Sequence, residues 1–318
     1  MAFDSSGKYL ASGSVDNSVR VWDVAAQQEV AELTGHTGSV DSVAFDSSGK
    51  YLASGSYDKS VRVWDVAAQQ QVAELTGHTD AVRSVAFDSS GKYLASGSSD
   101  KSVRLWDVAA QQQVAELTGH TRGVLSVAFD SSGKYLASGS EDASLRLWDT
   151  HALAAVAVLA GLSSPITSVH FSPSSSLVAA ASSDACVRLW SAPSGAPVAT
   201  LTNRTRAAIC SVAWSSDEAL VAAGACDGSV SVWESATGLQ RSFLQCPHAA
   251  PVAAITLAPA AALIAVAVGP PSACAHVFDV ASSSLLASPA LRGAAELLQW
   301  SADGQCLKDD QGALWRKP

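Results

Sequence analysis

Histidine, serine and aspartate, the residue types of a nucleophilic catalytic triad, recur together three times in the first half of this 318-residue chain. A tryptophan completes each set, and the spacing of the members is the same every time. The sets are His36, Ser54, Asp58 and Trp64; His78, Ser96, Asp100 and Trp106; and His120, Ser138, Asp142 and Trp148. In the first set Ser56 is an alternative to Ser54. A serine activated by a histidine that an aspartate orients would make each set a hydrolase site.

The repetition itself favours a structural interpretation of these sets. Catalysis needs one exposed nucleophile, one oxyanion hole and one substrate pocket, and three equivalent copies supply none of these. We expect a chain of hydrogen bonds instead, in which the aspartate accepts from the imidazole, the imidazole reaches the serine hydroxyl, and the hydroxyl meets the indole N–H. Each buried polar group is then satisfied. We therefore predict that the sets join a loop to a sheet and that the protein is not an enzyme.

The sets lie in a sequence repeat of 42 residues, the spacing from Trp22 to Trp64. A segment that reads Phe-Asp-Ser-Ser-Gly-Lys-Tyr-Leu-Ala-Ser-Gly-Ser starts at Phe3, Phe45, Phe87 and Phe129. A Trp-Asp pair follows each copy, and a Gly-His pair closes the first three units. A period of about 40 to 45 residues that carries Gly-His and Trp-Asp is typical of a β-propeller built of four-stranded blades.

Each full unit predicts four short strands joined by turns. In the second unit the expected strands are Val40–Phe45, Tyr51–Ser56, Val61–Asp65 and Gln71–Leu75. Aspartate and glycine in the segment Asp-Ser-Ser-Gly-Lys supply the backbone conformations of the first turn. A blade of this kind cannot bury both faces alone, so the complete set of blades is the expected folding unit.

Residues 1–318 are predicted to form a single β-propeller domain, with regular repeats over 1–150 and degenerate repeats over 151–318. Eight Trp or Phe anchors mark eight third strands, but the chain begins and stops within a blade. The expected fold is therefore all-β, with seven or eight four-stranded antiparallel blades. Only Met1–Phe3 precede the first turn, which indicates that N-terminal residues are missing from this sequence.

The order Gly-His, Ser-x-Asp and Trp-Asp resembles the pattern of the WD-repeat family over residues 3 to about 280. The resemblance implies a β-propeller that docks protein partners, usually without catalysis. It also implies that the three sets are the structural hydrogen-bond sets of such blades. The final stretch, from Leu298 to Trp315, is similar to the last blade of echinoderm microtubule-associated-protein-like proteins. This second likeness implies a cytoskeletal protein as the alternative function.

Near-identical units differ from one another at few positions, and most of these fall at one end of the blade. They lie before the turn aspartate, after Gly-His-Thr and within the first strand, while the turns at the opposite end are unchanged four times. A constant frame with one variable end is typical of a recognition surface, and drift at exposed positions is the alternative. The predicted partner-binding rim consists of Tyr57, Arg83, Arg122, Glu141, Asp41, Asp80, Ser99 and Leu125.

Within this rim, Tyr57 and Arg83 are the expected anchors, because Tyr and Arg dominate interface energetics. Asp41, Asp80 and Glu141 would steer a partner with a basic surface. The chain carries a formal net charge of −9 and shows no basic stripe, so the sequence does not favour direct binding of nucleic acid. The sequence thus predicts a non-catalytic scaffold or adaptor that is a monomeric ring within a larger multiprotein complex.

The six cysteines form neither a zinc framework nor a disulfide scaffold, and we interpret them as substitutes for small apolar residues on strands. No metal or cofactor is expected. Without a secretory leader at Met1, a reducing compartment fits best, so we expect a cytoplasmic or nuclear protein that is not secreted. A hydrolase in a degenerate repeat would have to use Cys246 and His248, and Pro247 between them argues against it.

An uncharged apolar run over Ala249–Val268 has the length of a membrane span. Pro251 and Pro259 interrupt it. We interpret the run as two buried strands, Val252–Leu257 and Leu263–Val268, and expect no membrane insertion.

Overall fold

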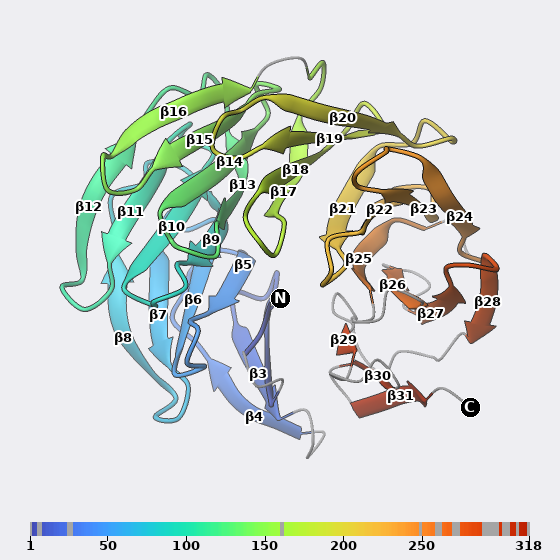
Figure 1. The fold of residues 1–318 in the computed structure, drawn as a ribbon. Helices are drawn as coiled ribbons and strands as arrows, with labels where there is room; N and C mark the ends of the chain where they lie inside the picture. Colours follow the sequence, from blue (N-terminus) through green and yellow to red (C-terminus); the bar gives the residue numbers. More distant parts are fainter. Residues whose placement is uncertain are drawn as a thin grey trace. The chain divides into compact units, whose positions relative to one another are not determined.

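The fold is a succession of β-strands in the part of the chain that the structure describes. The structure is a computed structural model, and it describes residues 2–4, 8–23, 28–159, 162–247, 250–257, 263–268, 274–287, 299–300, 306–309 and 312–316. Within these ranges every regular element is a strand, which confirms the predicted all-β class (Figure 1). No helix in the described ranges has the length and apolar character needed to cross a membrane.

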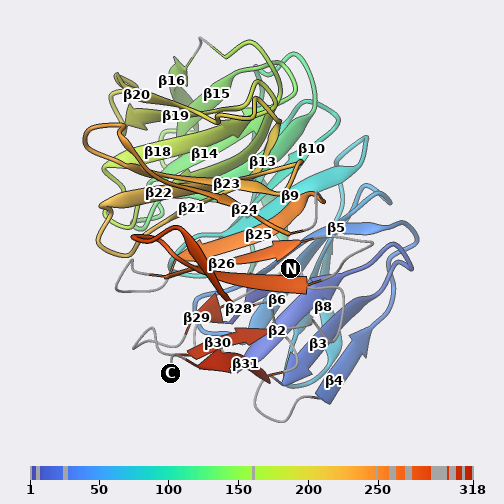
Figure 2. The same cartoon turned by 90° about the vertical axis from the view of Figure 1, so that its right-hand side faces the viewer.

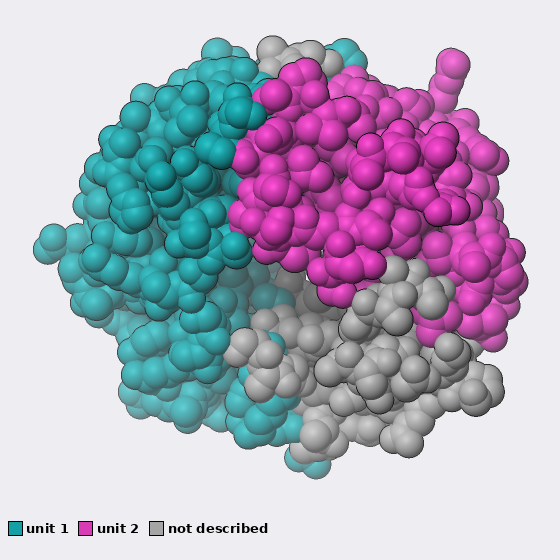
Figure 3. All heavy atoms as spheres, viewed as in Figure 1, with its two compact units in different colours: residues 1–171, 193–195 teal, residues 172–192, 196–318 magenta. Residues whose placement is uncertain are grey.

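The chain divides into two compact units, coloured separately in Figure 3. Unit 1 consists of residues 1–171 and 193–195, and unit 2 consists of residues 172–192 and 196–318. The predicted single domain over 1–318, its division at residue 150 and the number of blades stay predictions.

Unit 1 is built of consecutive strands that pair in chain order. The strands are β1 (Ala2–Phe3), β2 (Tyr9–Gly13), β3 (Val19–Asp23), β4 (Gln28–Leu33), β5 (Val40–Phe45), β6 (Tyr51–Ser56), β7 (Val61–Asp65), β8 (Gln70–Leu75), β9 (Val82–Phe87), β10 (Tyr93–Ser98), β11 (Val103–Asp107), β12 (Gln112–Leu117), β13 (Val124–Phe129), β14 (Tyr135–Ser140), β15 (Leu145–Asp149), β16 (Ala154–Leu159) and β17 (Ile166–Phe171). Strands β1–β4, β5–β8, β9–β12 and β13–β16 form four antiparallel sheets, which we call blades one to four. The predicted strands of the second repeat are observed, except that β8 begins one residue earlier, at Gln70.

Unit 2 continues the same pattern. Its strands are β18 (Leu177–Ser182), β19 (Cys186–Ser191), β20 (Pro197–Thr202), β21 (Ile209–Trp214), β22 (Leu220–Ala225), β23 (Ser229–Glu234), β24 (Gln240–Gln245), β25 (Val252–Leu257), β26 (Leu263–Val268), β27 (Cys274–Asp279), β28 (Ser284–Ala287), β29 (Gln299–Trp300), β30 (Cys306–Asp309) and β31 (Gly312–Arg316). Strands β21–β24 form a four-stranded antiparallel sheet, which we call blade six because it corresponds to the sixth sequence repeat. Strands β25–β28 form another four-stranded antiparallel sheet, and β29–β31 form a three-stranded sheet. The apolar run of residues 249–268 supplies β25 and β26, as predicted.

Antiparallel order decides which loops meet at each end of a blade. The turn between the second and third strands lies at the end where the chain enters the first strand. Backbone bonds join these two segments in blades two to four, where Tyr57, Ser99 and Glu141 donate N–H groups to the carbonyls of Ser39, Ala81 and Gly123, each at 2.9 Å. The predicted rim positions therefore share one end of each blade, which we call the variable rim.

Neighbouring blades of unit 1 are joined along their first strands, β5, β9, β13 and β17, which follow one another (Figure 1). Strands β5, β9 and β13 can also be found in Figure 2. The hydroxyl of Ser42 in β5 accepts a hydrogen bond from the backbone N–H of Val85 in β9 at 3.0 Å. Equivalent bonds at 3.1 Å link β9 to β13 and β13 to β17. A serine on each of these first strands thus helps to fix the position of the next first strand beside it.

Tryptophan side chains fill the space between blades. Trp64 packs with Val21 and Leu33 of blade one, and Trp106 packs with Val63 and Leu75 of blade two. Trp148 packs into blade three in the same way. Each tryptophan is almost fully buried, so one side chain contributes to the cores of two blades, and burial of a large aromatic ring is among the strongest packing contributions available.

The residue after each turn aspartate adopts a left-handed backbone conformation. Its φ is 72° at Lys59, 75° at Lys101 and 62° at Ala143, and Gly228 has the same conformation in blade six with a φ of 79°. Glycine enters this region freely, whereas residues with a Cβ are strained there. Variation between the repeats at this position is therefore limited by backbone geometry as well as by exposure.

Replacing Ala143 by glycine is expected to stabilise the protein by up to about 1 kcal/mol, because relief of left-handed strain exceeds the added entropy of the unfolded chain. The measurement is the midpoint of denaturant unfolding at constant slope. Ala109→Gly, at an exposed turn residue without positive φ, is the matched control and is expected to lower the midpoint. A lower midpoint for Ala143→Gly would contradict the strain argument.

Candidate functional site

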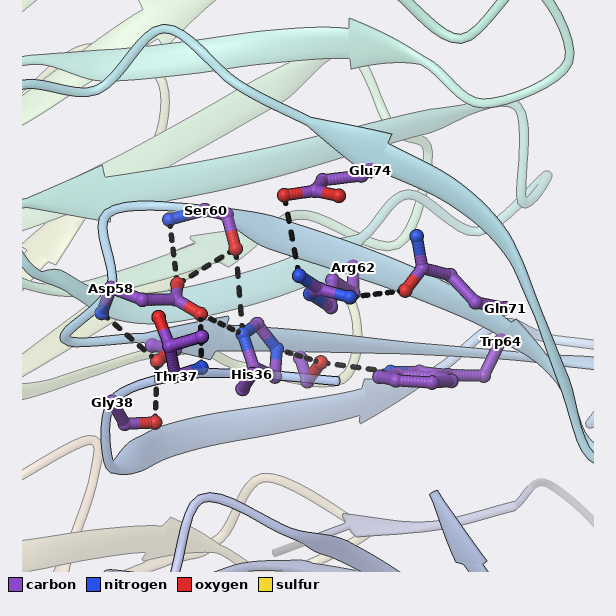
Figure 4. Close-up of polar contacts among 11 residues, drawn as sticks. His36, Thr37, Gly38, Asp58, Ser60, Arg62, Trp64, Gln71 and Glu74 are labelled. Carbon is purple, nitrogen blue, oxygen red and sulfur yellow. Dashed lines mark hydrogen bonds and ion pairs between the residues drawn. The ribbon is translucent and has the colours of Figure 1, made fainter. Parts of the chain in front are cut away.

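The first histidine set is a continuous chain of hydrogen bonds that crosses blade two (Figure 4). His36 Nδ1 lies 2.7 Å from Asp58 Oδ2, and His36 Nε2 lies 2.7 Å from Ser54 Oγ. The indole N–H of Trp64 donates to the same hydroxyl at 2.8 Å. The second copy has distances of 2.7, 2.8 and 2.8 Å, and the third has 2.9, 2.8 and 2.8 Å. The structure thus brings together the residues of all three predicted sets.

Ser54, and not its neighbour Ser56, is the serine of the first set. Ser56 instead donates to the carbonyl of Gly38 at 2.8 Å and ties the loop after the histidine to the strand. Ser54 is 0% exposed, and its hydroxyl is occupied by the imidazole and the indole. A substrate cannot reach this oxygen, so the geometry serves cohesion and not nucleophilic attack.

Protonation states in the sets follow from burial and from donated hydrogen bonds. Burial lowers the pKa of His36, because the charged imidazolium is desolvated, although Asp58 opposes the shift. Burial also acts to raise the pKa of Asp58, but bonds donated by Ser60, Thr37 and His36 outweigh it and lower that pKa to about 2. The neutral imidazole therefore donates from Nδ1 to the carboxylate and accepts the serine hydroxyl at Nε2.

The glycine before each histidine is favoured by its positive φ, and an arginine side chain passes close to it. Gly77 has a φ of 149°, and a Cβ at this position would lie 2.3 Å from Nη1 of Arg104. Arg104 lies on the third strand and bonds Gln113 on the fourth at 2.5 Å. The Gly-His pair thus combines a loop that passes close to an arginine with an imidazole that enters the blade.

At the variable rim, three predicted residues converge. Nη1 of Arg83, at the start of β9, lies 2.8 Å from Oδ2 of Asp41 in β5. The same guanidinium donates to the hydroxyl of Tyr57 and lies 5.0 Å from the centroid of its ring. Tyr57 stays 49% exposed. One arginine of blade three therefore holds an aromatic ring and a carboxylate of blade two in fixed positions.

The other predicted rim residues are not brought together. The Asp80 carboxylate accepts from the adjacent N–H of Ala81, and its backbone carbonyl accepts from the hydroxyl of Ser98. Ser99 and Leu125 are half-buried. Arg122 and Glu141 are exposed, and within the described residues their side chains make no hydrogen bond or ion pair with each other. The predicted rim is thus one ordered cluster flanked by separate polar side chains.

The repeats match the protein-family model described as WD domain, G-beta repeat, over residues 1–23, 27–65, 69–107, 111–149, 155–191 and 195–234. These segments make up more than half of the chain. The chain belongs to the WD-repeat family. The match confirms the predicted family and, with the all-β structure, the fold class of a WD-repeat β-propeller.

A curated protein of Arabidopsis thaliana, U3 snoRNP-associated protein-like EMB2271, is 44% identical over 43 residues. The match covers 14% of this chain and 9% of that protein. It is about one repeat long and spans a small part of the relative. WD repeats as a class indicate a protein-interaction scaffold and are generally non-catalytic, and the family match supports these two general statements for this chain.

WD repeats of this chain that lack the histidine satisfy the turn aspartate in other ways. Asp16 bonds Arg20 at 2.8 Å, and Asp184 in unit 2 bonds Arg188 at 2.8 Å. In blades two and three the equivalent arginine bonds a glutamine of the fourth strand instead. The arginine therefore replaces the imidazole as the partner of Asp16 and Asp184. In blade six, where serine stands at the arginine position, Ser229 bonds the turn aspartate Asp227.

Cys210 and Cys226 are two further candidate residues that lie outside the predicted rim, because that rim is defined by differences among the first four repeats. Cys210 and Cys226 occupy in blade six the positions of Asp41 and Tyr57 in blade two. The expectation that the cysteines replace small apolar residues on strands is wrong for Cys226, which lies in the turn after β22 and is exposed. Alignment of the sixth repeat with the second would have revealed the pair.

Neither a metal site nor the alternative hydrolase site gains support from the geometry. No group of three or more His, Cys, Asp or Glu side chains converges in the described part of the chain. Cys246 is 2% exposed, and its proposed partner His248 lies outside the described residues.

The substitution His78→Ala is expected to cost about 1–3 kcal/mol of unfolding free energy, because it leaves Asp100 and Ser96 underpaired while buried. Denaturant unfolding measures the loss. His151→Ala is the matched control, since this exposed histidine belongs to none of the sets, and its midpoint is expected to stay unchanged. An equally unchanged midpoint for His78→Ala would remove the energetic role of the set.

Acidification is expected to lower the melting temperature in two stages. The lowered pKa values of His36 and His120 mean that the unfolded state takes up protons first, so stability is lost as pH falls below about 6.5. Asp58 and Asp142, each with a pKa lowered to about 2, contribute stability that is lost as pH falls from about 4 toward 2. Thermal scans between pH 7.5 and 2 measure both stages, and the first stage is expected to shrink in the double variant His36→Ala, His120→Ala. A flat profile between pH 7 and 5 would contradict the histidine contribution.

Proposed function

We propose that this WD-repeat protein is a non-catalytic scaffold or adaptor that binds a protein partner through the variable rim. The observation that carries the proposal is the cluster of Tyr57, Arg83 and Asp41. Tyrosine and arginine are the residue types most enriched at the centres of protein interfaces. Here they are held together by each other on the surface of a rigid frame.

The internal bonds of the cluster support binding, because they reduce the ordering that a partner must otherwise impose. Arg83 is fixed by an ion pair on one side and an aromatic ring on the other, so little side-chain entropy remains to be lost. Tyr57 keeps half of its surface available for contact. A ring that is exposed yet immobilised is suited to fill a partner's pocket.

Charge favours a partner with a basic surface. The chain has a formal net charge of −9, and the exposed Asp80 and Glu141 add negative charge to the rim. Such charges steer association more than they add affinity. The proposal includes a monomeric ring within a larger complex, in the cytoplasm or nucleus, without direct binding of nucleic acid.

The cytoskeletal alternative rests on the likeness of residues 298–315, of which the structure describes residues 299–300, 306–309 and 312–315. It differs from the main proposal in the partner, which would be the microtubule. Co-sedimentation with microtubules in the presence and absence of the rim variant described below tests it directly.

The test of the main proposal is capture of partners by the intact chain and by the double variant Tyr57→Ala, Arg83→Ala. A partner bound through the rim is expected to lose at least about thirtyfold in affinity, the effect of removing about 2 kcal/mol at a hot spot. The matched control is Lys50→Ala, Lys92→Ala at the opposite end of the same blades, which is expected to bind like the wild type. Partners retained by the rim variant and lost by the lysine variant would place the binding site at the opposite end.

A further inference from the structure

Two cysteine residues meet at the rim end of blade six. Cys210 lies in β21 and Cys226 in the turn after β22. The backbone N–H of Cys226 donates to the carbonyl of Ala208 at 2.9 Å. Ile209 pairs with Ala225, and the register of β21 shifts between Ile209 and Ser211. Cys210 is thus the extra residue of a β-bulge, and such residues are re-aimed relative to a regular strand.

The second blade shows independently where side chains at these two positions point. Val40 pairs with Ser56, and the register shifts between Val40 and Ser42, so Asp41 and Tyr57 have the same backbone setting as the two cysteines. Both of their side chains contact the single guanidinium of Arg83. Two side chains at these positions therefore point to the same side of the blade end, where both reach one group.

In blade six the side chains at these two positions are thiols. Cys210 Sγ lies 3.9 Å from the carbonyl oxygen of Ala208, the same carbonyl that accepts from the backbone N–H of Cys226, so the two residues lie side by side. Burial, with a smaller contribution from the neighbouring Cys226, raises the pKa of the Cys210 thiol to about 12. Cys210 is half-buried, whereas Cys226 is exposed. The pair therefore has one accessible cysteine and one shielded cysteine beside it.

We propose that Cys210 and Cys226 form a redox-active dithiol that low-molecular-weight disulfides of the glutathione class convert into an intramolecular disulfide. Two thiols without a third ligand favour this chemistry over a metal site, because no larger group of His, Cys, Asp or Glu converges among the described residues. The proposal does not depend on the proposed binding function.

The exchange proceeds in two balanced steps. The thiolate of Cys226 attacks one sulfur of the small disulfide, forms a mixed disulfide and expels one small thiolate, which takes up the proton lost by Cys226. Cys210 then loses its proton and attacks the Cys226 sulfur, which expels the second small molecule as a thiol. One small disulfide is reduced to two thiols, and the two cysteine thiols are oxidised to one disulfide. The exposed Cys226 attacks first because access decides which thiol reacts.

Closure of this bond would tie the turn of residues 226–228 covalently to β21. The turn already bonds Ala208 through one N–H group, so the disulfide would lock a contact that exists in the reduced state. We therefore expect the oxidised protein to melt at a higher temperature than the reduced protein.

The test is peptide mapping after native incubation of the full chain with oxidised glutathione, followed by alkylation of the remaining thiols. Glu218 lies between the two cysteines in the sequence, so cleavage at glutamate yields two peptides that stay joined only by the proposed bond. Linked peptides are expected for the wild type and for the control Cys186→Ser, because Cys186 contacts Thr202 instead.

Single variants separate the two steps. Cys210→Ser is expected to accumulate glutathione on Cys226, because the attacking thiol of the second step is gone. Cys226→Ser is expected to leave Cys210 free, and neither variant should gain melting temperature on oxidation. The proposal would be overturned if the native wild type gave no linked peptides, or gave them only in urea. It would also be overturned if oxidation of the wild type stopped at the mixed disulfide.

Discussion

The blades depend on a buried polar chain that is satisfied from end to end. In blades two to four a carboxylate, an imidazole, a hydroxyl and an indole follow one another at hydrogen-bond distance. Removing the histidine leaves the buried aspartate and serine each with one partner fewer, and loss of a partner to a buried polar group costs more than the bond itself contributes. The loop before the first strand is held to the blade by this chain, so the position of the rim depends on it as well.

The tryptophan links that polar chain to the apolar packing. Its N–H closes the hydrogen-bond chain of its own blade, while its ring completes the core of the preceding blade. Orientation within one blade and adhesion to the next are therefore coupled through one side chain. The arginine that replaces the histidine as partner of Asp16 and Asp184 preserves the turn, but it places a partly exposed charge where the other blades have a buried ring.

Sequence periodicity predicted the strands and the histidine sets because both depend on contacts within one repeat. Three of the four strands of the second repeat have the predicted bounds, and β8 differs by one residue. The pairing of Arg83 with Tyr57 could not be predicted, because it depends on how two blades approach each other.

The unchanged Asp-Ser-Ser-Gly-Lys turns have a structural cause too, since Asp46 accepts from the backbone N–H of Tyr51 at 2.7 Å and Gly49 has a φ of 72°. Ser175 and Glu218 adopt the same conformation in later repeats, so that cause permits other sequences.

The serine bonds between successive first strands have an evolutionary consequence. Ser42, Ser84 and Ser126 each bind the next strand through the same atoms, and the glycine that faces the next blade recurs at Gly55 and Gly97. The serine bonds and the glycine contacts of these joints are therefore interchangeable, whereas the contact of Arg83 with Asp41 and Tyr57 is particular to blades two and three. Unequal recombination that removes or inserts one whole 42-residue unit leaves each remaining joint with the partner surface it had before. A gene built this way can change its number of units without first inventing a new interface.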